Sequence, residues 1–175
     1  MDPLLTFGHG TATEQEIVDL LNGAGVERVV DVRRFPGSRR HPHVAAAELE
    51  RWLPSAGIGY RWEPRLGGRR SAPRGTDSVD VWWEVAAFRA YAGHARTSEF
   101  REALGEVLEQ AVPRTAVMCS ESLWWRCHRR LIADVVVLLH DRPVLHLGHD
   151  GRLTEHRPAS GARVTAGGIV YDRAG

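Results

Sequence analysis

The segment with the greatest capacity for chemistry carries the chain's two cysteines. Cys119 and Cys127 lie eight positions apart, with Glu121 between them and His128 and Arg129 directly after the second cysteine. A thiol that ends a buried strand and meets a helix N-terminus, with arginine and histidine nearby, has its pKa lowered from about 8.5 by roughly one unit or more. We therefore predict that Cys119 is a nucleophile and that Cys127 is a candidate resolving thiol.

Two other interpretations of the cysteines stay open. Free cysteine is often a small, buried and unreactive core residue. A zinc site would combine both thiols with His128 and one of His9 or His41. The spacing C-x7-C-H matches no standard zinc pattern, so we assign no metal and no cofactor.

Arginines are concentrated after a second predicted strand. Asp31 and Arg33 end that strand, and Arg34, Arg39 and Arg40 follow within the next turn of chain. The guanidinium group suits bidentate contact with phosphate or carboxylate. An internal ion pair between Asp31 and Arg33 would explain the first two residues equally well, and both interpretations can hold together.

A third polar segment follows the first predicted strand. Gly8 and His9 stand between that strand and a helix N-terminus, where small residues let backbone amides approach an anion. Ordinary turn formation would also explain the glycine. His9 adds a side chain that titrates near neutral pH.

Hydrophobic periodicity supplies the elements that must position these residues. Predicted strands cover residues 4–8, 26–32, 58–62, 115–119, 144–147 and 152–155. Two predicted helices follow a capping box at Thr13 and a cap at Thr97 or Ser98. Three further predicted helices cover residues 45–53, 81–91 and 123–139. Strands that alternate with helices indicate an α/β fold with a largely parallel sheet of about five strands, helices on both faces and a C-terminal hairpin at Asp150-Gly151. In such sheets ligands bind beyond the carboxyl ends of the strands, where all three polar segments fall.

Composition sets limits on the class of protein. With 175 residues, 43% of them hydrophobic, the chain is long enough to form one domain over residues 1–175. Within it, the Arg- and Gly-rich stretch 67–80 is expected to be a mobile loop. The longest apolar run, residues 135–139, is far below the roughly 20 residues that span a bilayer, and the first residues lack a signal-peptide pattern. Two cysteines are no disulfide framework, so we expect a cytoplasmic protein with no membrane partner.

Charge points to a local anionic ligand. All 23 basic side chains are arginines, yet the net charge is only +1. Basic loops on a nearly neutral protein favour a single anion-binding site over a uniform nucleic-acid coat.

Six short motifs, in this order, resemble a widespread bacterial family, domain-of-unknown-function family 488. They are Thr6-Phe7-Gly8-His9, Val30-Asp31-Val32-Arg33, Leu66-Gly67-Gly68, Phe88-Arg89-Ala90-Tyr91, Met118-Cys119-Ser120-Glu121 and Cys127-His128-Arg129. The resemblance implies a compact α/β domain and a shared Cys, His, Arg and Glu cluster suspected of enzymatic work, with no established reaction. The chain departs from the pattern at Gly10, where a hydroxyl residue is expected, and in the loop from Arg69 to Asp80.

These observations lead to two functional hypotheses, and a third interpretation, a structural scaffold whose Cys-His-Arg segment is an internal network, stays open. The first is an enzyme that acts on an anionic, nucleotide-like or nucleic-acid-derived substrate, with Cys119 or Glu121 as the reactive group and His128 or His9 as the proton carrier. Its substrate-binding residues would be Gly8, Asp31, Arg33, Arg39, Arg126, Cys127 and Arg129. The alternative is a nucleic-acid-binding module with structural cysteines, in which arginine loops contact phosphates and tryptophan faces stack on bases. The tryptophans concerned are Trp82, Trp83, Trp124 and Trp125.

Overall fold

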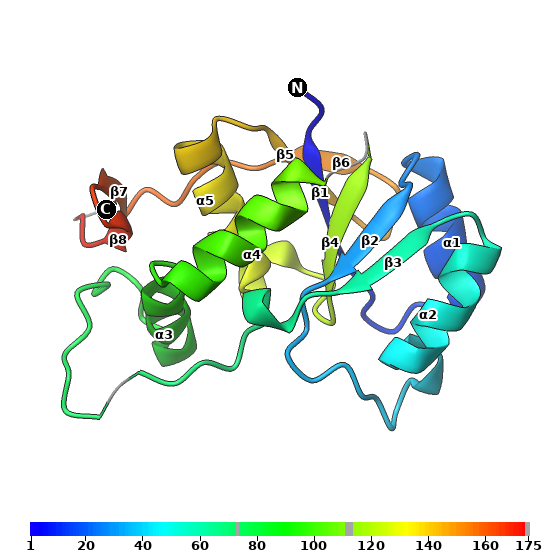
Figure 1. Cartoon of the computed structure of the whole chain (residues 1–175), viewed down its shortest axis with the longest axis horizontal. Helices are drawn as coiled ribbons and strands as arrows, with labels where there is room; N and C mark the ends of the chain where they lie inside the picture. Colours follow the sequence, from blue (N-terminus) through cyan, green and yellow to red (C-terminus); the bar gives the residue numbers. More distant parts are fainter. Residues whose placement is uncertain (73, 111–113, 174–175) are drawn as a thin grey trace.

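A computed structural model describes residues 1–72, 74–110 and 114–173. Its main sheet has six strands in the order β3-β2-β4-β1-β5-β6 (Figure 1). The strands are β1 (Leu4–Gly8), β2 (Arg28–Asp31), β3 (Gly59–Trp62), β4 (Thr115–Cys119), β5 (Val144–Leu147) and β6 (Leu153–Glu155). The first five are parallel and β6 is antiparallel to β5, which confirms the predicted α/β class and the hairpin at Asp150-Gly151.

Helices cover both faces of this sheet. They are α1 (Glu14–Gly23), α2 (Ala46–Ser55), α3 (Ala86–His94), α4 (Ser98–Glu109) and α5 (Arg129–His140). Helices α1 and α2 lie on one face, and α4 and α5 lie on the other, with α3 packed beside α5 (Figure 1). A second hairpin, β7 (Ala162–Thr165) with β8 (Gly168–Tyr171), also contacts α5 and was absent from the sequence prediction.

The sheet separates two hydrophobic cores. Leu4 and Val30 belong to the core under α4 and α5. Their neighbours Leu5 and Val29 belong to the core under α1 and α2. Successive side chains of a strand point to opposite faces, so strands buried on both faces must be apolar throughout. This is why the strand segments carry continuous apolar runs.

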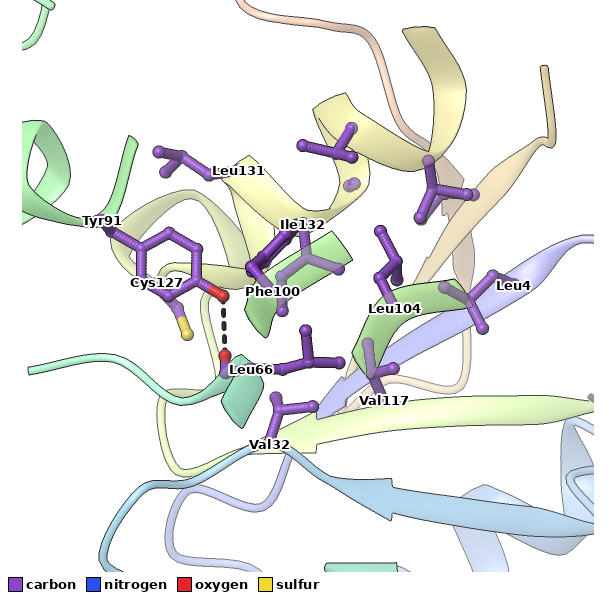
Figure 2. Close-up of a cluster of buried hydrophobic side chains, with 14 of the residues drawn as sticks. Leu4, Val32, Leu66, Tyr91, Phe100, Leu104, Val117, Cys127, Leu131 and Ile132 are labelled. Carbon is purple, nitrogen blue, oxygen red and sulfur yellow. Dashed lines mark hydrogen bonds between the residues drawn. The ribbon is translucent and has the colours of Figure 1, made fainter. Parts of the chain in front are cut away.

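The first core also holds both cysteines. Figure 2 shows Cys127 and Tyr91 in this cluster, and the Tyr91 hydroxyl donates a 2.6 Å hydrogen bond to the Leu66 carbonyl. The bond joins α3 to the residue that precedes Gly67-Gly68. Gly67 and Gly68 are thereby held against the same core as the two thiols.

The capping box predicted for the first helix is confirmed. The Thr13 hydroxyl accepts from the Glu16 amide, and the Glu16 carboxylate accepts from the Thr13 amide, each at 3.2 Å. Two donors that a helix start leaves without partners are satisfied in this way. Helix α1 consequently begins directly after the turn that carries His9.

Two predicted helices begin later than expected. The segment 81–91 becomes helical at Ala86, because the Trp82 amide donates instead to the Tyr171 carbonyl. The predicted helix over 123–139 is a short 3₁₀ turn, Trp124–Arg126, followed by α5 from Arg129. Cys127, between the turn and the helix, has an extended backbone with φ −128° and ψ 153°. Tertiary contacts of these residues override the local helical propensity.

Within the described residues of the stretch 67–80, no helix or strand forms. Its end is anchored, because the buried Asp80 carboxylate pairs with Arg96 at 2.8 Å and accepts from the Tyr171 amide at 3.1 Å. Mobility of the rest of the loop stays a prediction. Among the helices that the structure describes, none combines the length and apolar character needed to cross a membrane.

Candidate functional site

The carboxyl ends of three adjacent strands form the floor of a cavity. Strand β4 lies between β1 and β2, and pairs Gly8 with Cys119 and Asp31 with Met118. Beyond the strand ends lies a cavity of about 250 Å³. The side chains and backbone that line it are those of His9, Arg33, Arg34, Phe35, Gly37, Ser38, Gly68, Arg69, Cys119, Ser120, Cys127 and His128.

The structure brings five predicted site residues together here and leaves others away from the cavity lining. His9, Arg33, Cys119, Cys127 and His128 are the five that line it. The predicted residues outside the lining are Gly8, Asp31, Arg39, Glu121, Arg126 and Arg129. The predicted site lacked Arg34, Phe35, Gly68 and Arg69, although all four lie in the two segments that the sequence analysis identified as Arg-rich.

The two cysteines form the centre of the site. Their Sγ atoms are 2.8 Å apart, and both cysteines are free. Cys119 is 2% exposed and Cys127 is 6% exposed, so the thiols are reached from the cavity alone. The Cys127 sulfur also lies 3.5 Å from Nδ1 of His128.

The two thiols are electrostatically different. Burial raises the pKa of Cys119 well above its ordinary value, and the neighbouring Cys127 sulfur raises it further. Burial opposes ionisation of Cys127 as well, but the pKa of Cys127 lies well below its ordinary value, because the Cys119 thiol donates to its sulfur and because His128 and Arg129 favour the anion. The surroundings of Cys127 therefore favour its ionised form, and those of Cys119 favour the protonated thiol.

The prediction of a lowered pKa at Cys119 is wrong for a structural reason. It assumed that a helix begins just after β4. Helix α5 begins at Arg129 with His128 as its N-cap, so the positive end of the helix meets Cys127 and not Cys119. Of the two thiols, Cys127 is the one that the helix N-terminus can favour as an anion.

A buried cation lies next to the pair. Arg129 is 0% exposed, and its guanidinium donates to the Glu121 carbonyl at 2.5 Å, to the Ser122 carbonyl at 3.4 Å and to the Thr6 hydroxyl at 3.2 Å. Over the described ranges, no carboxylate forms a direct ion pair with it. A buried charge of this kind requires a compensating charge nearby.

A chain of buried hydrogen bonds connects this cation to a carboxylate. Thr6 Oγ1 is 2.6 Å from His146 Nδ1, His146 Nε2 is 2.9 Å from His156 Nδ1, and His156 Nε2 is 2.7 Å from Asp134 Oδ1. Every side chain of this hydrogen-bond chain is at most 4% exposed. The Tyr171 hydroxyl donates to the other carboxylate oxygen of Asp134 at 2.8 Å.

The protons of this chain can be assigned from its two ends. A carboxylate accepts, so His156 carries its proton on Nε2 and accepts at Nδ1 from His146. Burial, followed by the charges of His156 and Arg129, lowers the pKa of His146 to about 2, so this ring is neutral and accepts the Thr6 hydroxyl proton at Nδ1. Each group in the chain donates a hydrogen bond to the next group on the side of Asp134. The chain thereby connects the negative charge of Asp134 to the positive charge of Arg129.

His9 is also neutral. Burial lowers its pKa to about 4, with the Arg33 cation as a further cause in the same direction. Its Nδ1 donates to the Gly10 carbonyl at 2.9 Å, and its Nε2 lies 3.4 Å from the Arg33 guanidinium, from which it accepts. Of the two predicted proton carriers, His128 is the one in contact with a sulfur atom.

The internal ion pair expected at the second strand is present. Arg33 and Asp31 are both buried and lie 2.7 Å apart, and the Tyr60 hydroxyl donates to the same carboxylate at 2.7 Å. Arg33 also donates to the Val44 carbonyl at 2.7 Å. The guanidinium with which Arg33 lines the cavity is therefore already neutralised by Asp31.

The rim of the cavity carries further arginines. Arg34 and Arg69 lie over the ring of Phe35, at 5.3 Å and 6.0 Å from its centroid, and Phe35 is 60% exposed. Arg34 also donates to the Arg69 carbonyl at 3.0 Å. Neither guanidinium has a carboxylate partner within the described residues, so this side of the cavity keeps a positive charge for an anion.

Two glycines are required by close contacts at the site. A Cβ on Gly68 would lie 2.9 Å from Nδ1 of His128, and one on Gly8 would lie 1.8 Å from the Glu121 carbonyl oxygen. Gly8 therefore contributes by allowing the loop after β4 to approach β1. The glycines of the family motifs were the signal that could have added Gly68 to the predicted site.

Three predicted residues have other environments. The Glu121 carboxylate accepts from the Leu123 amide at 3.1 Å, and Glu121 reaches Arg129 through its backbone carbonyl. Arg39 and Arg126 are exposed. Within the described ranges, no group of three or more His, Cys, Asp or Glu side chains is placed to bind a metal ion.

Residues 13–136 match the family described as "Domain of unknown function DUF488". Both cysteines, His128, Arg129 and Asp134 lie inside the matching region, whereas Thr6, His9, His146 and His156 lie outside it. No curated protein and no solved structure matches the chain.

Replacing Gly8 by alanine tests the close approach of the Glu121 backbone to β1. The added Cβ meets backbone atoms that cannot move independently, so we expect Gly8→Ala to lower the free energy of unfolding by about 2 kcal/mol or more in urea titration. Gly105→Ala is the control, because Gly105 lies inside α4 with open space around it, and there alanine should raise stability by up to about 1 kcal/mol. Equal stability of both variants would contradict the contact.

Replacing Arg129 tests the source of the thiolate. An opposite charge nearby favours the ionised form, so Arg129→Met should raise the midpoint of Cys127 alkylation by about one pH unit or more. The measurement is the pH dependence of iodoacetamide labelling on folded protein, with the neutral, polar Arg129→Gln used if the Met variant fails to fold. Arg126→Met is the matched control on an exposed arginine and should leave the midpoint unchanged. An unchanged midpoint in Arg129→Met would show that the guanidinium does not act on the thiol.

Proposed function

The chain belongs to the DUF488 family, and we propose that it is a thiol-dependent enzyme that acts on a small anionic substrate, with Cys127 as the reactive thiolate. One observation carries the proposal: two sulfur atoms 2.8 Å apart at a cavity whose wall carries guanidinium groups. A reactive thiolate is found where positive groups surround a thiol that a substrate can reach. Cys127 meets both conditions.

The charge of the cavity supports an anionic substrate. Arg34 and Arg69 have hydrogen-bond donors available for phosphate or carboxylate oxygens. Phe35, between them, is an exposed aromatic face on which a planar group can stack. A nucleotide-like molecule, or a fragment derived from nucleic acid, combines these two properties.

The contacts suggest a role for each group. Cys127 attacks the substrate, and His128, with Nδ1 beside the sulfur, accepts or returns a proton. Cys119 donates to the Cys127 sulfur and holds it as an acceptor. Arg129 stabilises the thiolate, and the Glu121 backbone carbonyl holds Arg129 in place. A reduced thiol pair of this kind suits a reducing compartment such as the cytoplasm.

Separate alkylation of the two cysteines tests the proposal. On folded, reduced protein between about pH 5 and 9, Cys127 should react with iodoacetamide with a midpoint below about 8, and Cys119 should react slowly over the same range. Mass spectrometry of proteolytic fragments distinguishes the two sites. The variants Cys119→Ser and Cys127→Ser confirm the assignment, since serine preserves the hydrogen-bonding group in each position. If both thiols react only after unfolding, the cysteines are structural.

Binding to nucleic acid is a second candidate, favoured by exposed aromatic and basic side chains. Trp62 and Trp125 are each 47% exposed, and Arg39 and Arg40 are exposed beside the cavity loop. Trp83, which the sequence offered as a stacking face, is buried at 4% exposure and is unavailable.

Salt dependence separates binding from catalysis. A binder should lose affinity for a single-stranded oligonucleotide steeply between about 50 and 200 mM salt, and Arg39→Ala should reduce the slope by about 1. Cys127→Ser should bind as well as the wild type in this case. Absence of binding at low salt, or a response flat in salt, would reject this candidate.

A further inference from the structure

We infer that Cys119 and Cys127 form a dithiol–disulfide couple, and that the cavity admits small anionic disulfides, which this couple reduces. The inference rests on the proposed function, because it gives the reaction class to the same site. Its first support is distance. The two sulfur atoms lie 2.8 Å apart, whereas a disulfide bond is about 2.05 Å long, so the bond forms after a movement of less than about 1 Å.

The pair is also divided into an attacking and a resolving thiol. Cys127 lies at the start of α5, beside His128, and accepts from Cys119. Cys119 ends β4, and its thiol also lies 3.6 Å from the Glu121 carbonyl, to which it can donate. Thiol–disulfide exchange requires one thiolate to attack and one further thiol to release the mixed disulfide. The two environments provide one of each.

The size of the cavity limits the partner to a small molecule. Its volume is about 250 Å³, and the two cysteines are 2% and 6% exposed. One end of a low-molecular-weight disulfide can enter such a space. A disulfide on the surface of another folded protein would have to bring bulky neighbouring residues with it.

Charge selects among small disulfides. Arg34 and Arg69 lie on the cavity wall without carboxylate partners in the described chain, and Arg129 adds a buried positive charge behind the sulfurs. A disulfide that carries carboxylates is attracted to this field, and one that carries ammonium groups is repelled. Anionic disulfides are therefore the substrate class that the site favours.

The reaction has two balanced steps. The Cys127 thiolate attacks one sulfur of R–S–S–R; the S–S bond breaks, its electron pair leaves on R–S⁻, and Cys127–S–S–R forms. Cys119 then gives its proton to the departing thiolate and attacks Cys127 Sγ, which releases the second R–S⁻. The protein, which starts as one thiolate and one thiol, loses two electrons and one proton and becomes the Cys119–Cys127 disulfide. R–S–S–R leaves as one R–SH and one R–S⁻, and the R–S⁻ takes its proton from water. A soluble dithiol such as dithiothreitol restores the reduced pair.

Glutathione disulfide and cystamine are the probes, since the first carries carboxylates and the second carries ammonium groups. In reduced wild-type protein, glutathione disulfide should convert both thiols to an internal disulfide, with a mass loss of two hydrogen atoms and loss of both alkylation sites. Cys119→Ser should instead accumulate one glutathione on Cys127. Cys127→Ser should react at least about tenfold more slowly than the wild type. Alanine at either position serves where the serine variant fails to fold.

A double arginine variant tests the charge selection. The wild type should react with glutathione disulfide at least about tenfold faster than with cystamine at low salt, and Arg34→Ser with Arg69→Ser should abolish this preference. Arg152→Ser with Arg157→Ser removes two exposed arginines outside the cavity wall and should retain it. Equal wild-type rates for the two probes would overturn the selection of anionic disulfides.

The outcomes separate this inference from the proposed function. If Cys127 is alkylated rapidly below pH 8 but Cys119→Ser forms no mixed disulfide and the wild type keeps both thiols, the redox couple is refuted and the thiol enzyme stands. If Cys127 reacts with neither iodoacetamide nor either disulfide until the protein unfolds, both fail.

Discussion

The buried guanidinium of Arg129 is the group on which the other parts of the site depend. An isolated charge inside a protein is destabilising by several kcal/mol unless it is compensated. Here Asp134, reached through Thr6, His146 and His156, lies on one side of Arg129, and the Cys127 sulfur, whose ionisation Arg129 favours, lies on the other. Arg129 thereby connects the ionisation of the Cys127 thiol to the buried hydrogen-bond chain that ends at Asp134.

This chain also explains how the elements are held together at the site. Thr6 belongs to β1, His146 to β5, and Asp134 to α5, so the chain ties the centre of the sheet to the helix that begins beside Cys127. The ring of Trp124 stacks on His146 with centroids 4.1 Å apart and an interplanar angle of 3°. That stacking keeps the residues before Cys127 out of the helix and close to β5. The position of the reactive sulfur is thus a result of packing as well as of electrostatics.

The order of the strands concentrates the polar groups. Because β4 lies between β1 and β2, the ends of these three strands are direct neighbours, and each contributes to one cavity. His9, Arg33 and Cys119 therefore converge although more than 100 residues of chain separate the first from the last. The cavity is positive on the wall that carries Arg34 and Arg69, and its two sulfurs are buried. These features together support the proposal of a small anionic substrate.

The sequence by itself determined the class of fold and the edge of the sheet at which the site lies, because strands buried on both faces carry continuous apolar runs and ligands bind beyond the ends of parallel strands. It located β1 and β4 at their observed bounds and identified the capping box of α1. Only the tertiary structure decided which cysteine has surroundings that favour its ionised form. Trp124, just before α5, stacks on His146 of β5, and local helical propensity cannot anticipate a contact with a residue so far along the chain. The hydrogen-bond chain behind Arg129 joins residues as far as 140 positions apart, a separation that no sequence periodicity spans.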